Sequence, residues 1–558
     1  MKINLAGDIK DSTIFSKKAS LKDKIIAIAY IFINLSFWIA LFIVIMINFY
    51  AAGSIFTYGD NHDHHLAFFS YLSGMAANGI LPGIDFYSPH SVFIPLIVGI
   101  FFKIFGISQV NLGLADGVII FLTFIFIYKS ARFVISNIFA KLAILTLLLS
   151  HSGRDLPWFN DVIMLFVAMG IYFLASYIND NKRYKLIILG IICFMLPYLR
   201  HQGLVIAFVF LSLPLILFYI NAIKEANYKR MFKNILFSFL IANLIFLLFI
   251  FLRNGIEGLE ILFFSLTSLV DMSQPAIGYD NSIPQIAYSI FNYTSEGMDW
   301  HGYFIRFLSY WFIVIIPSLY FIYRPFSLYA SKQAILNEDS IRFVTALVVL
   351  STIVFNYPIN EDARMKVQFG VGIWLFIDSL RLCFYNKNIK IISIIALAIV
   401  FLLINHSKIT EFSNKFYSNY TDIFNLKGKI KMDNNTPYSK MKFRDEYAQY
   451  LNSLLYALYD YNIKHPNKQI IFDGELVEIN AYLFLLFSGN EVALQHKFPY
   501  HYGSFDRYGF VSDLKERFNA FVDSAKPIII GCSTTPQRDD YKVLKEINEK
   551  CKILVPKE

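Results

Sequence analysis

The sequence predicts a polytopic α-helical membrane protein of about eleven transmembrane helices, with interfacial helices in its first outer loop and a C-terminal extracytoplasmic α/β domain. The 558-residue chain is 56% apolar and only 16% charged, whereas soluble proteins carry about 25% charged residues. Many of its apolar runs reach the length of a bilayer span without a charge inside them. Short loops between these runs carry most of the basic residues, which gives the helices a direction.

The N-terminal segment fixes that direction. It carries six lysines: Lys2, Lys10, Lys17, Lys18, Lys22 and Lys24. These lysines predict that residues 1–24 are a cytoplasmic tail. The apolar stretch 25–50 is too long for the hydrophobic region of a signal peptide and is predicted to be the first spanning helix. The net charge of +9 lies mainly in this tail and in short loops, so topology explains it and nucleic acid is not an expected partner.

The apolar run 92–105 decides how the later helices are oriented. If it crosses the membrane, Lys129, Arg132 and Lys141 fall outside and every later basic loop is inverted. If it lies in the interface, all of these loops become cytoplasmic, so the interfacial arrangement is predicted. The remaining crossings are then 113–128, 138–150, 162–178, 186–199, 204–220, 235–252, 303–323, 343–355, 370–384 and 391–405.

The transmembrane domain is predicted to span residues 25–406, with a long outer loop at 253–302. A polar linker at 407–437 precedes an extracytoplasmic domain at 438–558. Strands are predicted in that domain at 469–472, 492–494 and 527–531, and helices in DGELVEINAYLFLLFSGN and at 511–525. This alternation predicts a small α/β sheet. No glycine-rich phosphate loop is present.

Four cysteines divide into two pairs by location. Cys193 and Cys383 lie in apolar helices and are predicted to be packing residues. Cys532 and Cys551 lie in the terminal domain, where an extracytoplasmic location would allow a disulfide between them. No CxxC and no Cys/His zinc spacing occurs.

The first outer loop holds the most unusual group of polar residues. Asp60, His62, Asp63, His64 and His65 follow the first helix. An amphipathic helix at 66–77, a Gly-Pro turn at 79–83, the sequence DFYSPH and the interfacial run come next. Charged residues beside a bilayer are usually only solvated, but this order predicts a structured cap with a carboxylate at its start.

This ordered layout resembles the polyprenyl-phosphate-dependent glycosyltransferases of the GT-C superfold, which include the aminoarabinose transferase of lipid A and the protein O-mannosyltransferases. Asp60 matches the acid of the family's first loop, whereas Asn61 stands where relatives often have a second acid, and Asp63 could substitute for it. The resemblance covers about the first 220 residues well and the remainder only in layout.

Further matches follow along the chain. Asp161 begins the helix DVIMLFVAMGIYFL at the place where relatives carry an aspartate, with Asp155 as a competing candidate. Arg200 in PYLRHQG stands at the family's lysine position. Arg364 and Lys366 precede a helix, as basic or tyrosine residues do in relatives. Simpler interpretations are that Asp161 only complements the helix dipole and that Arg200 only snorkels to the interface.

The resemblance implies an inverting transfer of a sugar from a lipid phosphate. Asp60 would act as general base, and Arg200 with Arg364 or Lys366 would bind the departing phosphate. His90 and Asp63 are candidate substrate contacts. A divalent metal, Mg or Mn, would use Asp60, Asp63 and Asp161. The expected partners are a polyprenyl-phosphate sugar, membrane lipids and a glycan, lipid or protein acceptor of the cell envelope, at the cytoplasmic (inner) membrane.

Two other functions stay open. An O-antigen polymerase or ligase carries its key arginines and histidines in a large late loop, whereas the 253–302 loop starts with Arg253 alone. A lipid-linked glycan flippase or transporter is expected to have broken helices near the membrane midplane, often in repeated halves, and the sequence has no such repeat.

Overall fold

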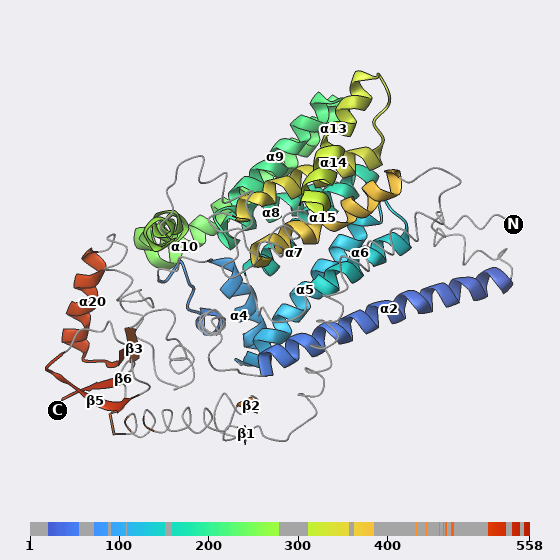
Figure 1. Ribbon diagram of the computed structural model, residues 1–558. Helices are drawn as coiled ribbons and strands as arrows, with labels where there is room; N and C mark the ends of the chain where they lie inside the picture. Colours follow the sequence, from blue (N-terminus) through green and yellow to red (C-terminus); the bar gives the residue numbers. More distant parts are fainter. Residues whose placement is uncertain are drawn as a thin grey trace.

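The computed structural model describes residues 21–54, 72–86, 91–107, 109–150, 159–277, 311–356, 362–383, 430–431, 442–443, 457, 461, 464–465, 470–473, 512–531, 538–546 and 552–557. A bundle of helices forms the larger part (Figure 1). Its helices are α2 (Leu21–Ser54), α4 (Phe93–Phe105), α5 (Gln109–Ala131), α6 (Asn137–Ser150), α7 (Phe159–Asp180), α8 (Tyr184–Leu199), α9 (Gly203–Tyr219), α10 (Glu225–Ile277), η1 (Trp311–Ile315), α13 (Ile316–Ala330), α14 (Asn337–Ser351), η2 (Thr352–Asn356) and α15 (Asp362–Cys383).

Helices α2 and α5 are antiparallel. Near one end, Asn137 just beyond α5 donates to Asn34 of α2 at 3.2 Å. Near the other end, Gly117 of α5 lies against Phe49 of α2. The segment between these helices therefore starts and finishes at the same end of the bundle, which we call the first-loop end. This geometry agrees with the prediction that the run 92–105, which forms α4, does not cross.

The later helices alternate in direction. Arg200 at the end of α8 contacts Asn160 at the start of α7, and Lys185 at the start of α8 contacts Asp180 at the end of α7. Helix α8 runs parallel to α10, since Arg183 bonds Asn234 and Tyr198 bonds Asn243. The same alternation holds for α14 and α15, whose ends meet through Arg342–Asp378 and Thr352–Gln368.

Helix α10 corrects the predicted boundary at residue 252. The helix continues to Ile277, but Gly255 has φ 64° and ψ −149°, so two helices meet there. These angles lie in a region that is essentially limited to glycine. The first part of the predicted outer loop 253–302 is thus helical.

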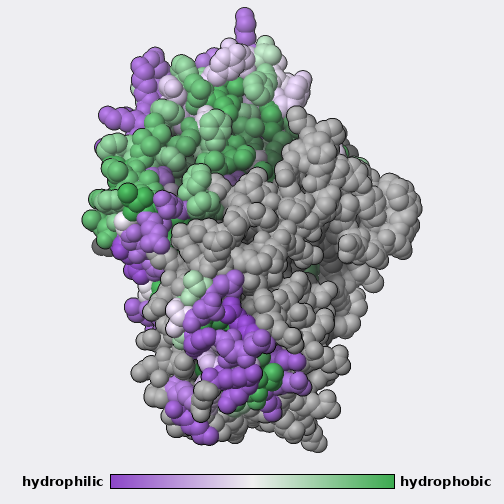
Figure 2. Space-filling view, turned by 90° about the vertical axis from the view of Figure 1, so that its left-hand side faces the viewer, coloured by the Kyte–Doolittle hydropathy of each residue, from purple (hydrophilic) through white to green (hydrophobic). Residues whose placement is uncertain are grey.

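The bundle has the apolar exterior of a multi-pass membrane protein. Among the described residues, five helices are long and apolar enough to cross a membrane: Ile31–Tyr50, Val110–Ala131, Asn160–Asp180, Glu225–Leu266 and Trp311–Ala330. Large side chains such as Phe237, Leu244 and Leu252 of α10 are exposed. Figure 2 shows hydrophobic residues over the upper part of one face, where the helices lie, and hydrophilic residues over the lower part.

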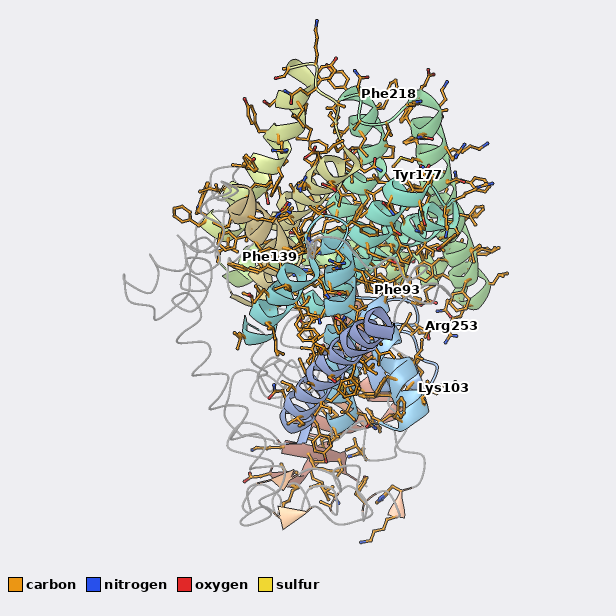
Figure 3. All side chains as sticks on the ribbon, turned by 90° about the vertical axis from the view of Figure 1, so that its right-hand side faces the viewer. Phe93, Lys103, Phe139, Tyr177, Phe218 and Arg253 are labelled. Atoms are coloured by element: carbon orange, nitrogen blue, oxygen red, sulfur yellow. The ribbon has the colours of Figure 1, made fainter. Side chains whose placement is uncertain are left out.

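Basic residues gather in the short connections at the opposite end of the bundle, which we call the basic end. Lys182 and Arg183 follow α7, Lys224 precedes α10, and Lys332 follows α13. Figure 3 shows Tyr177 and Phe218 toward this end, and Phe93, Lys103 and Arg253 toward the first-loop end.

The C-terminal part contains α20 (Ser512–Ala525) and a four-stranded sheet in the order β3-β4-β6-β5. The strands are β3 (Ile470–Asp473), β4 (Ile528–Gly531), β5 (Tyr541–Glu546) and β6 (Lys552–Pro556). Strands β3 and β4 are parallel, and β6 is antiparallel to both β4 and β5. The sequence predicted β3, α20 and β4 but not β5 and β6, while the predicted helix after β3 and the strand 492–494 lie outside the described residues.

A second, two-stranded sheet pairs β1 (Ile430–Lys431) with β2 (Lys442–Phe443). Strand β1 lies within the predicted linker 407–437, so part of that polar segment has regular structure.

Candidate functional site

The end of α8 forms the centre of the candidate site. The helix stops at Leu199, and Arg200 adopts an extended conformation with φ −162° and ψ 137°. A tight turn follows, in which the Gly203 N–H donates to the Arg200 carbonyl at 2.7 Å. Only three residues therefore separate α8 from α9, and the Arg200 side chain is carried at the first-loop end of the bundle.

Gly203 makes this turn sterically feasible. A Cβ atom at this position would lie 2.2 Å from the Leu196 carbonyl oxygen and 2.6 Å from its carbon. Both are backbone atoms, so a rotamer change cannot relieve the overlap. The glycine of the RHQG sequence is needed because the two helices approach so closely.

Two elements, α7 and η2, hold the Arg200 side chain. Its Nη1 donates to Oδ1 of Asn160 at 2.9 Å. Its guanidinium lies over the ring of Phe355 in η2, with Cζ 5.6 Å from the ring centroid. Asn160 is 0% exposed and the adjacent Asp161 is 1% exposed, both in the first turn of α7. Asp161 thus begins its helix as predicted, and it follows directly after the residue that binds Arg200.

The start of α15 lies at the same end. Gly370 approaches Met164 of α7 so closely that an added Cβ would lie 2.2 Å from the Met164 sulfur. Lys366 precedes Gly370 by one helical turn, and Asp161 precedes Met164 by a similar distance. The backbone positions of Arg364 and Lys366 are therefore at the end that carries Asp161 and Arg200, while their side chains lie outside the described part.

The first loop is attached to the same turn. The Val92 N–H donates to the Tyr198 carbonyl at 3.0 Å, and the Ser91 hydroxyl donates to the same oxygen at 3.3 Å. Rings from α4, α8 and α10 pack around this point, with the Phe93 centroid 5.4 Å from Tyr198 and 5.1 Å from Phe246. Asp60, Asp63 and His90, which were predicted for this loop, lie outside the described residues.

His201 is a site neighbour that the sequence reasoning missed. Burial and the charge of Arg200 lower the pKa of this imidazole to about 4. Its buried Nδ1 has no hydrogen-bond partner within the described part of the chain. A neutral ring beside Arg200 leaves the guanidinium as the positive group of this turn at neutral pH.

Two further polar residues at this end were also missed. Asn160 gave no signal, because an asparagine at a helix start is ordinarily a cap. Asp116 lies in the second turn of α5 and is 0% exposed. Its position inside an apolar run was a usable signal, because ionisable residues in spanning helices often mark functional sites.

The described residues include only part of the predicted metal site. Within the described ranges, no three His, Cys, Asp or Glu side chains gather as they would around a metal ion. Of the three predicted carboxylates, the structure describes Asp161 alone. A Mg or Mn site that includes Asp60 and Asp63 stays a prediction.

The comparisons with known proteins bear on the fold. No protein-family model matches the sequence, and no curated protein matches it. The crystal structure of ArnT from Cupriavidus metallidurans bound to undecaprenyl phosphate matches with a TM-score of 0.53 at 11% identity, over 93% of this chain and 98% of that one. The apo structure of the same protein gives 0.53 at 10% identity, over 94% and 98%. An oligosaccharyltransferase from Archaeoglobus fulgidus gives a lower TM-score of 0.47 at 11% identity, over 89% of this chain and 69% of that one.

The chain therefore has the fold of ArnT along nearly its whole length. The resemblance to GT-C glycosyltransferases, which the sequence showed mainly in its first 220 residues, is confirmed at the level of the fold. Identity near 11% shows the fold alone, so the reaction is argued separately.

Proposed function

We propose that this chain is a membrane glycosyltransferase that moves a sugar from a polyprenyl-phosphate donor to a glycan, lipid or protein of the cell envelope. The reaction would take place on the outer side of the inner membrane. The observation that carries the proposal is the Arg200 guanidinium, held by Asn160 and Phe355 at a junction of helix ends. The fold around it is shared with ArnT, a protein solved with undecaprenyl phosphate bound.

The donor phosphate defines the first requirement. A departing phosphate carries negative charge, and a guanidinium matches its oxygens in a bidentate geometry. Arg200 supplies this group, and Arg364 or Lys366 at the start of α15 would supply a second cation. Asp161 places a carboxylate next to the Asn160 contact, where it would accept hydrogen bonds from sugar hydroxyls or share a divalent metal.

The acceptor defines the second requirement. Asp60 would take the proton from an acceptor hydroxyl while that oxygen attacks the anomeric carbon. The bond from this carbon to the phosphate oxygen breaks, and its electron pair leaves with the polyprenyl phosphate. A single displacement inverts the anomeric configuration. The phosphate is a stable anion, so no general acid is needed.

The Asp60→Asn variant tests this assignment. Membranes that contain the variant are supplied with a polyprenyl-phosphate sugar, and transfer is measured against the unmodified chain. We expect a loss of at least about 100-fold, because general base catalysis contributes this much. Glu225→Gln, an exposed change at the basic end, serves as control and keeps full activity. Retained activity in Asp60→Asn at equal expression would rule out Asp60 as the base.

A second experiment tests the proposed orientation of the protein in the membrane. A cysteine at Ser108, between α4 and α5, is expected to react with an impermeant thiol reagent added from the outer side. Reaction only from the cytoplasmic side would invert the proposed topology.

A further inference from the structure

A compact polar cluster ties the first loop to α10. Residues 79–86 double back in a tight turn, in which the Gly83 N–H donates to the Phe86 carbonyl at 2.7 Å and Pro82 forms an isolated bridge with Phe86. Ile84 and Phe86 are fully buried. The hairpin contacts α10 near Gly255, where the two helical parts of α10 meet. We call residues 79–86 the hairpin and residues 256–277 the outer part of α10.

Asp85 is the centre of the cluster. Its Oδ1 accepts from Nε of Arg253 at 2.7 Å and from Nδ2 of Asn254 at 2.8 Å. Its Oδ2 accepts from Nη2 of Arg253 at 2.6 Å and from the Leu81 N–H at 2.7 Å. Arg253 therefore binds the carboxylate in a bidentate manner, which fixes direction as well as distance.

The same two α10 residues also bind the hairpin backbone. Nη2 of Arg253 donates to the Gly79 carbonyl at 2.7 Å, and Nδ2 of Asn254 donates to the Ile84 carbonyl at 2.9 Å. The hairpin is thus held at its beginning and at its tip by adjacent residues of one helix. Gly255 follows at once and turns the chain into the outer part of α10.

The outer part of α10 covers the other side of the hairpin. A Cβ added to Gly83 would lie 3.6 Å from the Cβ of Ser265, a residue that is only 4% exposed. Gly83 has φ +73°, so a side chain there is strained in addition to being crowded by Val92. The hairpin therefore contacts both parts of α10.

The hairpin leads directly into the candidate site. Five residues after Phe86, Ser91 and Val92 bond to the Tyr198 carbonyl, two residues before Arg200. The same loop carries Asp60 upstream in the sequence. Arg200 itself is fixed by α7 and η2.

From this arrangement we infer that Asp85 and Arg253 are positioning residues, which hold the first loop and the outer part of α10 in the geometry that the transfer reaction needs. They act on the loop that carries the base, whereas Arg200 is held by α7 and η2. The inference rests on the proposed function for its kinetic consequence, but its structural part is independent of any activity.

The electrostatics of the pair are consistent with this role. Burial raises the pKa of Asp85, but hydrogen bonds from Arg253, Leu81 and Asn254 outweigh burial, and the pKa lies below its usual value. Asp85 is therefore ionised throughout the neutral range. The two side chains are 15% and 36% exposed, so their specificity comes from the number and direction of bonds more than from charge alone.

Hydrogen exchange of the full-length protein in detergent tests the structural part. Arg253→Met removes the donors while keeping an unbranched side chain, and Asp85→Asn is a milder second variant that keeps the shape of the acceptor. We expect backbone exchange in 79–86 and 256–266 to rise by at least about tenfold in Arg253→Met and by less in Asp85→Asn. Lys229→Met breaks the exposed Glu225–Lys229 pair of the same helix and is the matched control, with no change in these segments.

Kinetics test the positioning role. We expect kcat to fall by about tenfold or more in Arg253→Met while the KM for the lipid donor changes less than twofold, because Arg200 is held elsewhere. Unchanged exchange in both variants would overturn the inference. A raised KM with unchanged kcat would also overturn it, because Arg253 would then bind the donor. If the unmodified protein shows no transferase activity, the proposed function is refuted. The hydrogen-exchange result would still decide whether the Asp85–Arg253 cluster holds the hairpin.

Discussion

The turn between α8 and α9 gives a direct prediction for Gly203→Ala. The new Cβ would lie 2.2 Å from the Leu196 carbonyl oxygen, whereas ordinary contact begins near 3.4 Å. The turn that carries Arg200 therefore has to move by about 1 Å, because the Leu196 carbonyl oxygen and carbon belong to the backbone and cannot rotate away. Overpacking of this kind costs about 1–3 kcal/mol, which lowers the Tm of a helical domain this large by only a few degrees.

The larger effect is expected on catalysis. A displacement of about 1 Å at a positioned group can reduce the rate by about 100-fold, so we expect kcat/KM of Gly203→Ala to fall by this order while most of the protein stays folded. The assay measures sugar transfer and Tm on the same detergent-purified sample. Gly372→Ala is the matched control, because its nearest neighbours are the methyl groups of Val349 at 3.2 and 3.6 Å. Equal kcat/KM in the two variants would refute the claim that Gly203 sets the position of Arg200.

Two further predictions concern His201 and the terminal cysteines. The pKa of His201 falls from 6.5 to about 4 on folding, so the unfolded chain binds the proton first and stability is full above about pH 6.5. It then declines by about 2 kcal/mol as the pH falls to 5. A Tm series from pH 7 to pH 5 is expected to show a weaker decline in His201→Asn, and equal slopes would contradict the assignment. In the sequence, Cys532 follows Gly531 and Cys551 precedes Lys552, and Gly531 and Lys552 are partners in the antiparallel β4–β6 register. Mass spectrometry of non-reduced peptides is therefore expected to detect a Cys532–Cys551 disulfide. Detection of both cysteines as alkylated thiols would contradict this prediction.

Much of the helical domain could be predicted from the sequence because its signals are local. Apolar runs between basic loops marked six of the described helices within about four residues: α2, α5, α6, α7, α8 and α9. Three later helices were predicted with displaced ends: α13 continues to Ala330 and not to 323, α14 begins at Asn337 and not at 343, and α15 begins at Asp362 and not at 370. The prediction that 92–105 does not cross required only the sign of the loop charges, and the antiparallel arrangement of α2 and α5 agrees with it. The predicted crossing 391–405 lies outside the described residues.

Helix α10 shows where local signals fail. Its apolar run ends at Leu252, and the following Arg253, Asn254 and Gly255 have the composition of a loop. After the break at Gly255, the chain nevertheless continues as a second helix to Ile277. Asp85 and the hairpin backbone bind the polar residues at the break, and these partners lie about 170 positions earlier in the sequence. The sequence of α10 alone therefore cannot show that these polar residues have bonding partners in the first loop.

The candidate site was predictable in kind but not in detail. Asp161 and Arg200 were identified because they stand at positions where the sequence resembles GT-C glycosyltransferases, and the motifs that carry this resemblance are local. Asn160 binds Arg200 across 40 residues of sequence, and its residue type is ordinary for a helix start. Strand β5 (Tyr541–Glu546) was missed because its alternation is weak: apart from Tyr541, its residues are exposed or half-buried.

The three residues from Tyr198 to Arg200 explain why the site forms at this helix end. The Tyr198 carbonyl accepts from the first loop, and its hydroxyl donates to Asn243 of α10 at 3.0 Å. Arg200, two residues later, is bound by α7 and covered by η2. One turn of backbone thus joins four parts of the chain that are distant in sequence. A group held by so many independent elements is rigid without a dedicated scaffold, and rigidity of this kind is what allows a cation to meet a developing phosphate charge without reorganisation.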